Sequence, residues 1–322
     1  MRERALEYAL CARLERERDW LVSRQLGGGV HDPGGRVLDV VGIATTDDVD
    51  RRARLTDASI PASLVTAAIG PGVARRWHAI DGLPTADARR IVDRGVGVGF
   101  LDREYRGGQE YVRQVERYPQ WVERLVGVEL KPDLGSPGAL ERQLRADVSL
   151  GVLDAVVLAT RSYVTGAHRN RLPEAVGIWR IGADGSIAVE REPATLDPKR
   201  HGLEIRDIQP GRVDVTPVAP PAKRRARIRI AERAWAKGWR HFELPACAAI
   251  EPDRTETPLP YCNILERVVD PPVSCGPDCP HHEPAAAPTV DFEAERDRVT
   301  NWRSNPPGRQ RCQATLERYS RR

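Results

Sequence analysis

The sequence predicts an α/β protein with one central sheet, an inserted helical segment and a cysteine-rich carboxy-terminal module. Residues 4–20 show helical spacing of Leu6, Leu10 and Leu14, and strand-like residues follow directly. Residues 153–159 (LDAVVLA) are nearly all apolar, as in a strand buried at the centre of a sheet. Helical and strand-like segments alternate again after residue 121, which completes the α/β pattern.

The composition is that of a folded chain. The 322 residues are 40% hydrophobic and 30% charged, with a mean hydropathy of −0.48, which excludes a fibrous or wholly disordered protein. No apolar run approaches the roughly 18 residues of a membrane helix, and the amino-terminal segment is charged throughout. We therefore expect a cytoplasmic protein without a membrane partner. The net charge of +4 is too small to identify a partner.

The core is predicted from two separate stretches, residues 1–46 and 121–191. After the first helix, residues 21–26 and 36–44 are expected to form a β-hairpin around the glycines at 27–29. Residues 124–130 form a strand, 137–150 a helix and 153–159 the buried strand. A helix at 162–171 and strands at 175–181 and 186–190 complete this part.

Residues 47–120 are expected to form an insertion that resembles a winged helix. Helical stretches near 61–69, 73–80 and 86–96 precede a hairpin whose strands, 100–105 and 109–115, flank two glycines. Three short helices closed by a hairpin is the winged-helix order. A helical insertion of no particular type is the alternative.

The remaining chain is divided into a linker, residues 192–220, and a third unit, residues 221–322. The linker is rich in proline and appears irregular in sequence. Residues 221–238 form a basic helix, with eight cations and one glutamate between positions 223 and 240. We expect it to bind nucleic-acid phosphates, with Trp235 and Trp239 for stacking, through Lys223, Arg224, Arg225 and Arg227. A solvated helix with core tryptophans is the alternative.

The segment Gly127–Lys131 (GVELK) carries the strongest sign of chemistry. Alternation along a strand places Glu129 and Lys131 on one face, and Asp39 is a second carboxylate inside an otherwise apolar strand. Two carboxylates on adjacent strands suit Mg²⁺ or Mn²⁺, and a nearby lysine could orient water for phosphodiester hydrolysis. Only four of the 50 basic residues are lysine, so a lysine in this position is notable. A surface salt bridge is the alternative.

This arrangement resembles the PD-(D/E)xK, or restriction-endonuclease-like, nuclease superfamily. The resemblance covers residues 4–46 and 122–190 and implies an α-β-β-β-α-β core. It implies that Asp39 and Glu129 hold the metal, that Lys131 is catalytic, and that Glu15 is an additional ligand. Gln143 matches a glutamine of the exonuclease-like branch.

Three features depart from that pattern. No proline directly precedes Asp39, the gap from Asp39 to Glu129 is long, and Asp147 stands where a tyrosine is often found. The whole chain is also similar to an uncharacterised haloarchaeal protein family, in RQLGGGVHDPGGRVLDVV, VELKPDLG and the cysteine-bearing tail. That family has no assigned activity.

The expected function is therefore metal-dependent cleavage of DNA. The alternatives are a non-catalytic DNA-binding protein on a degenerate nuclease scaffold and a zinc-stabilised regulatory protein.

Cysteines form a second candidate site at Cys247, Cys262, Cys275 and Cys279. Successive members are separated by 14, 12 and 3 residues. They lie in a Pro/Gly-rich loop, which needs a cross-link or a metal ion to hold a fixed shape. Four thiolates can close a Zn²⁺ site, and His281 or His282 could replace one of them. The spacing lacks the paired CxxC of zinc ribbons. The superfamily resemblance also allows a 4Fe-4S cluster, to which Cys11 could contribute. The third alternative is that these cysteines bind no metal.

Overall fold

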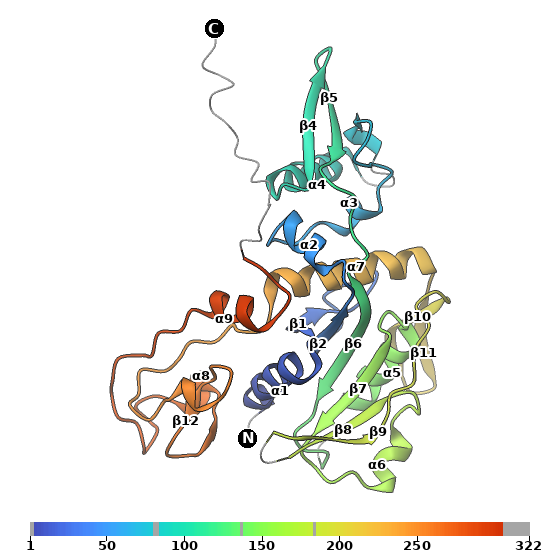
Figure 1. Ribbon diagram of the computed structural model, residues 1–322. Helices are drawn as coiled ribbons and strands as arrows, with labels where there is room; N and C mark the ends of the chain where they lie inside the picture. The colour runs from blue at the N-terminus through green and yellow to red at the C-terminus, as the bar shows by residue number, and fades with distance from the viewer. Residues whose placement is uncertain (1–2, 80–83, 136–137, 183–184, 305–322) are drawn as a thin grey trace.

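A six-stranded mixed sheet forms the centre of the protein (Figure 1). The computed structural model describes residues 3–79, 84–135, 138–182 and 185–304. The strands lie in the order β1-β2-β6-β7-β8-β9, with β6, β7 and β8 parallel and the other neighbours antiparallel. Their bounds are β1 (Leu21–Gly27), β2 (Val37–Thr45), β6 (Val122–Leu130), β7 (Ala155–Thr160), β8 (Gly177–Ile181) and β9 (Ile187–Arg191).

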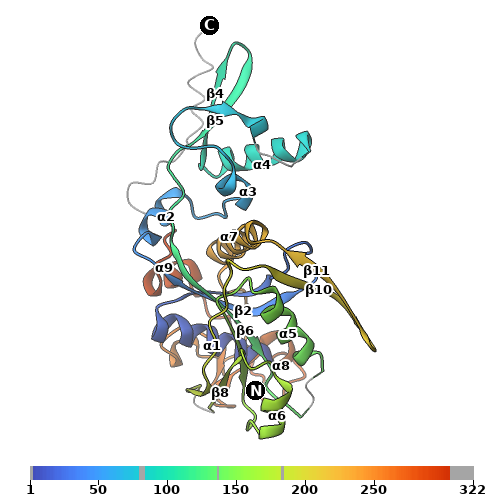
Figure 2. The ribbon, with the colours of Figure 1, turned by 90° about the vertical axis from the view of Figure 1, so that its right-hand side faces the viewer.

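Helices cover both faces of this sheet (Figures 1 and 2). The first helix, α1 (Glu3–Arg18), packs its leucines with Val40 and Val126 on one face. On the other face, α5 (Leu140–Leu150) and α7 (Pro220–Lys237) pack against Val41 and Leu125. Neighbouring residues of β6 thus enter different cores, as strand alternation requires. The α/β class is confirmed, and the core elements lie within a few residues of their predicted bounds, with α6 at Gly166–Arg171.

The insertion folds around its own core. Its elements are α2 (Val49–Leu55), α3 (Ala62–Thr66), β3 (Arg75–Arg76), the 3-10 helix η1 (Trp77–Ala79), α4 (Thr85–Gly97), β4 (Leu101–Arg106) and β5 (Gln109–Gln114). The strands form a small sheet in the order β3-β5-β4. The helix predicted over residues 73–80 is therefore wrong, because residues 75–76 pair with β5 and residues 77–79 form the 3-10 helix η1. Leu64, Val92, Phe100 and Val112 are fully buried in its core. The insertion stands beyond α7, on the side away from the central sheet (Figure 1).

The segment predicted as an irregular linker contains a β-hairpin. Strands β10 (Gly202–Gln209) and β11 (Arg212–Val218) pair in antiparallel fashion around the turn at Gly211, whose φ is +78°. Pro210 lies in the turn and Pro217 near the end of β11, so neither interrupts the middle of a strand. The proline content therefore hid the strand pattern.

The cysteine-rich module lies beside α1 and has little regular structure (Figure 1). After α7 the chain forms η2 (Pro252–Arg254), β12 (Tyr261–Cys262), β13 (Arg267–Val268), α8 (Pro271–Ser274) and α9 (Phe292–Val299). The end of the predicted third unit, residues 305–322, lies outside the described residues, as do the predicted helical positions 80 and 137. Among the described helices, none is long and apolar enough to cross a membrane.

A buried ion pair joins the insertion to α7. Arg52 of α2 and Glu232 of α7 approach to 2.5 Å, with side chains 0% and 1% exposed. Glu232 also accepts hydrogen bonds from the Ile60 amide at 2.7 Å and the Tyr118 hydroxyl at 2.8 Å. Since a buried charge requires full compensation, this carboxylate fixes the start and the end of the insertion to one point of α7.

Replacing Arg52 with methionine should destabilise the protein by about 3–5 kcal/mol, because Glu232 then stays charged and unpaired in the interior. Urea denaturation of Arg52→Met measures the loss, and Arg54→Met, at an exposed position of the same helix, is the matched control. The double variant Arg52→Met/Glu232→Leu should recover only part of the stability, because it removes the unpaired charge but leaves the Ile60 amide and the Tyr118 hydroxyl without their acceptor. A loss below about 1 kcal/mol in Arg52→Met would contradict this assignment.

Candidate functional site

The two predicted carboxylates meet at one end of the central sheet. Val40 of β2 pairs with Val128 of β6. The next positions, Asp39 and Glu129, therefore lie opposite each other at the same end of the sheet. The Leu130 amide donates a hydrogen bond of 2.9 Å to Asp39 Oδ2, so the Asp39 side chain caps the end of β6. This end of β6 points downwards in Figure 1 and lies near the start of α1.

Asp39 is the common neighbour of four other carboxylates. Its charge raises the pKa of each, in addition to the larger effect of burial, and they come from α1, β6 and α5: Glu3, Glu7, Glu129 and Asp147. Burial likewise raises the pKa of Asp39 itself. Five acidic side chains, of which only Glu3 is exposed, thus lie around Asp39, and we refer to them as the acidic cluster.

Arg36 neutralises part of the acidic cluster. Its Nη2 atom lies 2.6 Å from Glu129 Oε2 and 2.6 Å from Asp147 Oδ2, and its Nε donates to Asp147 Oδ1 at 3.0 Å. Burial raises the pKa of Glu129 to about 7, against the opposing effect of Arg36 and with a further rise from Asp39. One guanidinium therefore spans the two carboxylates on the α5 side of the cluster.

Lys131 lies directly after β6 and is partly buried. Its amide donates to the Ala159 carbonyl at 2.9 Å, which holds this backbone beside β7. Within the described chain, its side chain has no hydrogen bond or ion pair, and its charge opposes the burial-driven rise in the pKa of Glu3. Lys131 thus acts electrostatically on the α1 side of the cluster.

The structure places Glu15 away from the acidic cluster. Its carboxylate is buried and pairs with Arg240 at 2.6 Å. Glu15 is eight residues after Glu7 on α1, about 12 Å along the helix axis. The residues of α1 near Asp39 are instead Glu3 and Glu7, spaced four apart on one face. Glu15 therefore lies apart from Asp39 and Glu129, which corrects the expectation that it joins them, whereas Glu3 and Glu7 of the same helix are near Asp39.

Gln143 lies on α5 one turn before Asp147, so both occupy the same side of that helix. Asp147, the residue that departs from the superfamily pattern, is the one that pairs with Arg36. Sequence analysis missed Arg36 as well, although its place directly before β2, three residues before Asp39, was an available signal.

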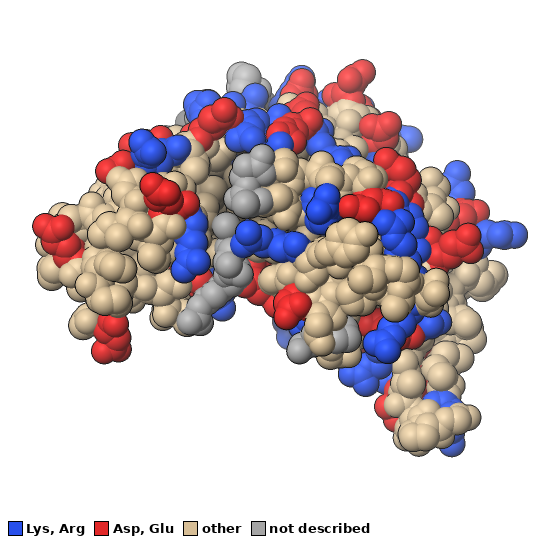
Figure 3. All heavy atoms as spheres, turned by 90° about the horizontal axis from the view of Figure 1, so that it is seen from below, with Lys and Arg blue, Asp and Glu red and all other residues tan. Residues whose placement is uncertain are grey.

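Charges are mixed on the surface around this end of the protein. Figure 3 shows acidic and basic side chains side by side on the face seen from below. The acidic cluster is therefore a local feature of the sheet end rather than part of a broad acidic surface.

The four residues of the basic helix that are predicted to contact phosphates fall into two pairs. Lys223 is 1% exposed, and its Nζ donates to the Arg200 carbonyl at 3.1 Å. Arg227 pairs with Asp154 at 2.7 Å and donates to the Val152 carbonyl. These two cations stabilise the fold, which corrects the expectation that they contact nucleic acid.

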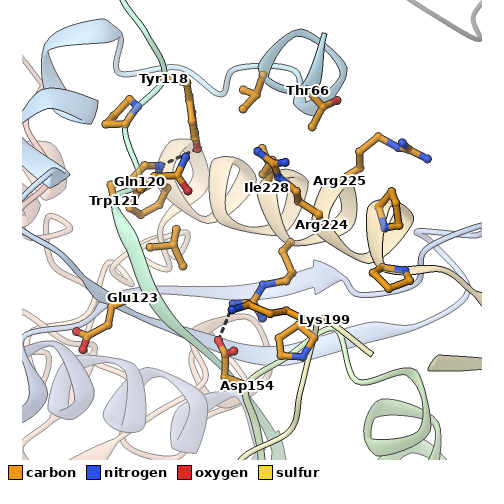
Figure 4. A pocket seen from close by; sticks show the side chains of 17 residues that line it. Thr66, Tyr118, Gln120, Trp121, Glu123, Asp154, Lys199, Arg224, Arg225 and Ile228 are labelled. Atoms are coloured by element: carbon orange, nitrogen blue, oxygen red, sulfur yellow. Dashed lines mark hydrogen bonds and ion pairs between the residues drawn. The ribbon is translucent and has the colours of Figure 1, made fainter. Parts of the chain in front are cut away.

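Arg224 and Arg225 are exposed and line a cavity of about 760 Å³ between α7, the insertion and the start of β6 (Figure 4). Lys199 adds a third exposed cation, and Tyr118 and Gln120 line the opposite wall. Trp235 and Trp239 are 0% exposed and belong to the core, so the predicted stacking role is not available to them.

The four predicted zinc ligands lie in one module. Cys247 and Cys262 are buried, Cys275 and Cys279 are half-buried, and all four are free thiols. As the atoms are placed, no group of three or more His, Cys, Asp or Glu side chains in the described ranges could hold a metal ion. This holds for both the thiols and the acidic cluster.

Comparison with known proteins gives a family without a function. Residues 21–284 match a family of unknown function, DUF5787. The chain belongs to this family. No curated protein and no solved structure shows a match. The DUF5787 match includes Asp39, Glu129, Lys131 and the four cysteines, whereas Glu3 and Glu7 precede it.

The raised pKa of Glu129 predicts how the stability of this DUF5787 protein depends on pH. A folded-state pKa of about 7 against a usual 4.5 means that the folded protein holds this proton more tightly than the unfolded chain. The contribution is complete below about pH 4.5 and is lost as pH rises towards 7. Thermal or urea unfolding between pH 4.5 and 7.5 should therefore show stability falling by about 1–3 kcal/mol.

Glu129→Gln, which cannot ionise, should have a smaller slope over the same range. Glu123→Gln, at an exposed position of the same strand, should keep the wild-type slope. Equal slopes in wild type and Glu129→Gln would refute the assignment.

Proposed function

We propose that this protein is a metal-dependent nuclease that hydrolyses phosphodiester bonds in DNA. The observation that carries the proposal is the placement of Asp39 and Glu129 on adjacent strands at one sheet end, with Lys131 following. The order α1, β1, β2, β6, α5, β7 supports the resemblance to the PD-(D/E)xK superfamily, with the insertion between β2 and β6.

The donor set of the acidic cluster fits a hard divalent cation. Mg²⁺ prefers carboxylate oxygens. Burial raises the pKa values of Glu7 and Glu129, the charge of Asp39 raises them further, and a bound cation would relieve this repulsion. Asp39 and Glu129 would hold the ion, with Glu3 in the role expected of Glu15. Glu7 is less suited to this role, because it is buried and paired with Arg24 at 2.5 Å. When bound, such an ion supplies an activated water and neutralises charge on the phosphate.

Lys131 is suited to act on the phosphate and the attacking water. Its ammonium has no fixed partner in the described part of the chain, so it is free to donate a hydrogen bond to a phosphate oxygen. As a compact cation it would stabilise charge that develops on that oxygen. Gln143 would position the water or the phosphate from α5.

DNA would contact the insertion and the exposed part of α7. The order α3, β3, η1, α4, β4, β5 supports a winged-helix-like arrangement, in which helices precede a hairpin. Arg224, Arg225 and Lys199 supply cations for backbone phosphates at the cavity beside it.

The contact of Arg36 with the cluster favours a second candidate, a non-catalytic DNA-binding protein on the same scaffold. A guanidinium on Glu129 and Asp147 already supplies the positive charge that a metal would bring. For catalysis, Arg36 must release Glu129 when the cation binds. In the second candidate it stays in place.

Cleavage of single- and double-stranded DNA with Mg²⁺ or Mn²⁺ separates the two candidates. Lys131→Ala should reduce the single-turnover rate by at least about 100-fold, because charge on the transition state loses its donor. Arg142→Ala, an exposed cation on α5, should cleave at the wild-type rate. Wild-type cleavage by Lys131→Ala would exclude this lysine, and DNA binding without cleavage in any variant would favour the second candidate.

Removing the two exposed arginines should weaken binding without affecting the fold. Arg224→Ala/Arg225→Ala should lower DNA affinity and reduce the slope of log K against log salt by about 2, since each phosphate contact contributes about 0.9. Arg233→Ala, an exposed arginine farther along α7, is the matched control. Titrations of labelled DNA at several salt concentrations give both slopes, and an unchanged slope in the double variant would place the DNA elsewhere.

A further inference from the structure

The cysteine-rich module has too small an apolar core to hold its shape by packing alone. Between residues 243 and 290 the regular structure consists of the 3-10 turn η2, the two-residue strands β12 and β13, and the short helix α8. The buried members of its cluster are Leu244, Cys247, Ala249, Ile250, Cys262 and Val269. Modules with so few core residues generally depend on a disulfide or a metal, and the described cysteines form no disulfide.

The four thiols face a common region inside this module. Burial, followed by the charges of Cys262, Cys247 and Cys279, raises the pKa of Cys275 to about 11. Cys247 and Cys262 are each 7% exposed, and Cys275 packs against the cluster that contains them. Side chains from three separate loops therefore converge.

Backbone hydrogen bonds explain the convergence. Ile250 forms a β-bridge with Cys262, and the Ile250 amide donates to the Cys247 carbonyl at 3.1 Å. The chain turns after Cys279, where the His282 amide donates to the Cys279 carbonyl at 3.0 Å. It then returns to pair Pro284 with Cys247.

An unsatisfied buried nitrogen lies in the same turn. His282 Nδ1 is buried, yet it has no hydrogen-bond partner among the described residues. Buried polar atoms in folded proteins nearly always have a partner. A bound group or a charged sulfur beside this turn would supply the missing one.

We propose that Cys247, Cys262, Cys275 and Cys279 bind one Zn²⁺ ion as thiolates and that this ion holds the module together. Thiolates favour Zn²⁺ over hard cations and bind it tetrahedrally at about 2.3 Å. Since no three of these thiols form a metal-binding group in the described structure, binding of the ion would require the three loops to move inwards. Four thiols lose their protons to the solvent as four Zn–S bonds form, with no change in oxidation state.

A metal-bound thiolate also explains the histidine. Cys279 precedes His282 by three residues, and its sulfur, once charged, offers an acceptor for the buried Nδ1–H. The imidazole then supports the site without being a ligand.

Elemental analysis of the full chain, purified without chelator, tests the proposal independently of DNA cleavage. We expect one zinc per chain, and loss of that zinc in Cys275→Ser and Cys279→Ser. Cys11→Ala changes a fully buried cysteine of α1 and should keep the full zinc content. Replacement of zinc by Co²⁺ should give the intense thiolate charge-transfer and visible bands of a tetrahedral four-sulfur site.

Because a serine variant can fail to fold, the wild-type protein provides a second test. Stripping the metal with a chelator should lower Tm, and titration with zinc chloride should restore it with the release of protons from the thiols. Three results would overturn the proposal: bound iron with broad visible absorption, a disulfide among these cysteines, or a metal-free protein whose Tm changes with neither chelator nor zinc.

Discussion

The structure depends on the carboxylate of Glu232, which lies on α7 where the sheet and the insertion meet. A charge buried to this degree is stable only when its hydrogen-bonding capacity is met, and Arg52, Ile60 and Tyr118 meet it from the insertion. Because these residues come from both ends of the insertion, the chain leaves β2 and returns to β6 at nearly the same place. The pairing of β2 with β6, and with it the meeting of Asp39 and Glu129, survives an interruption of more than seventy residues.

At the far end of the same strands, the electrostatics are unfavourable. Burial raises the pKa values of Glu7, Asp39, Glu129 and Asp147, and the charge of Asp39 adds to the rise at the other three, so this region costs stability at neutral pH. Arg36 offsets part of that cost without removing it. Conflicts of this kind concentrate at binding and catalytic sites, which supports the proposed role of the acidic cluster. Arg36 then supplies, at Glu129 and Asp147, the positive charge that a bound metal ion would supply.

The sequence was sufficient for features that depend on local pattern and insufficient for those that depend on contacts between distant segments. Periodicity located α1, β2, β6 and β7, and the Glu-x-Lys pattern located the end of β6. The orientation of α7 was hidden, because Lys223 and Arg227, four residues apart, face the core while Arg224 and Arg225 face solvent. Likewise, the choice between Glu7 and Glu15 depends on which end of α1 lies beside Asp39, which no local pattern contains.

The cysteine-rich module and the acidic cluster are linked through α1. Leu259 and Val268 of the module pack in the same core as the leucines of α1, Arg240 pairs with Glu15, and Arg4 reaches Asp270 at 3.4 Å. The helix that presents Glu3 and Glu7 to Asp39 is therefore held from the sheet on one side and from the module on the other. A metal ion that fixes the module would restrain α1 against the repulsion within the acidic cluster. The structural site would in this way set the geometry of the candidate catalytic one, although neither shares a ligand with the other.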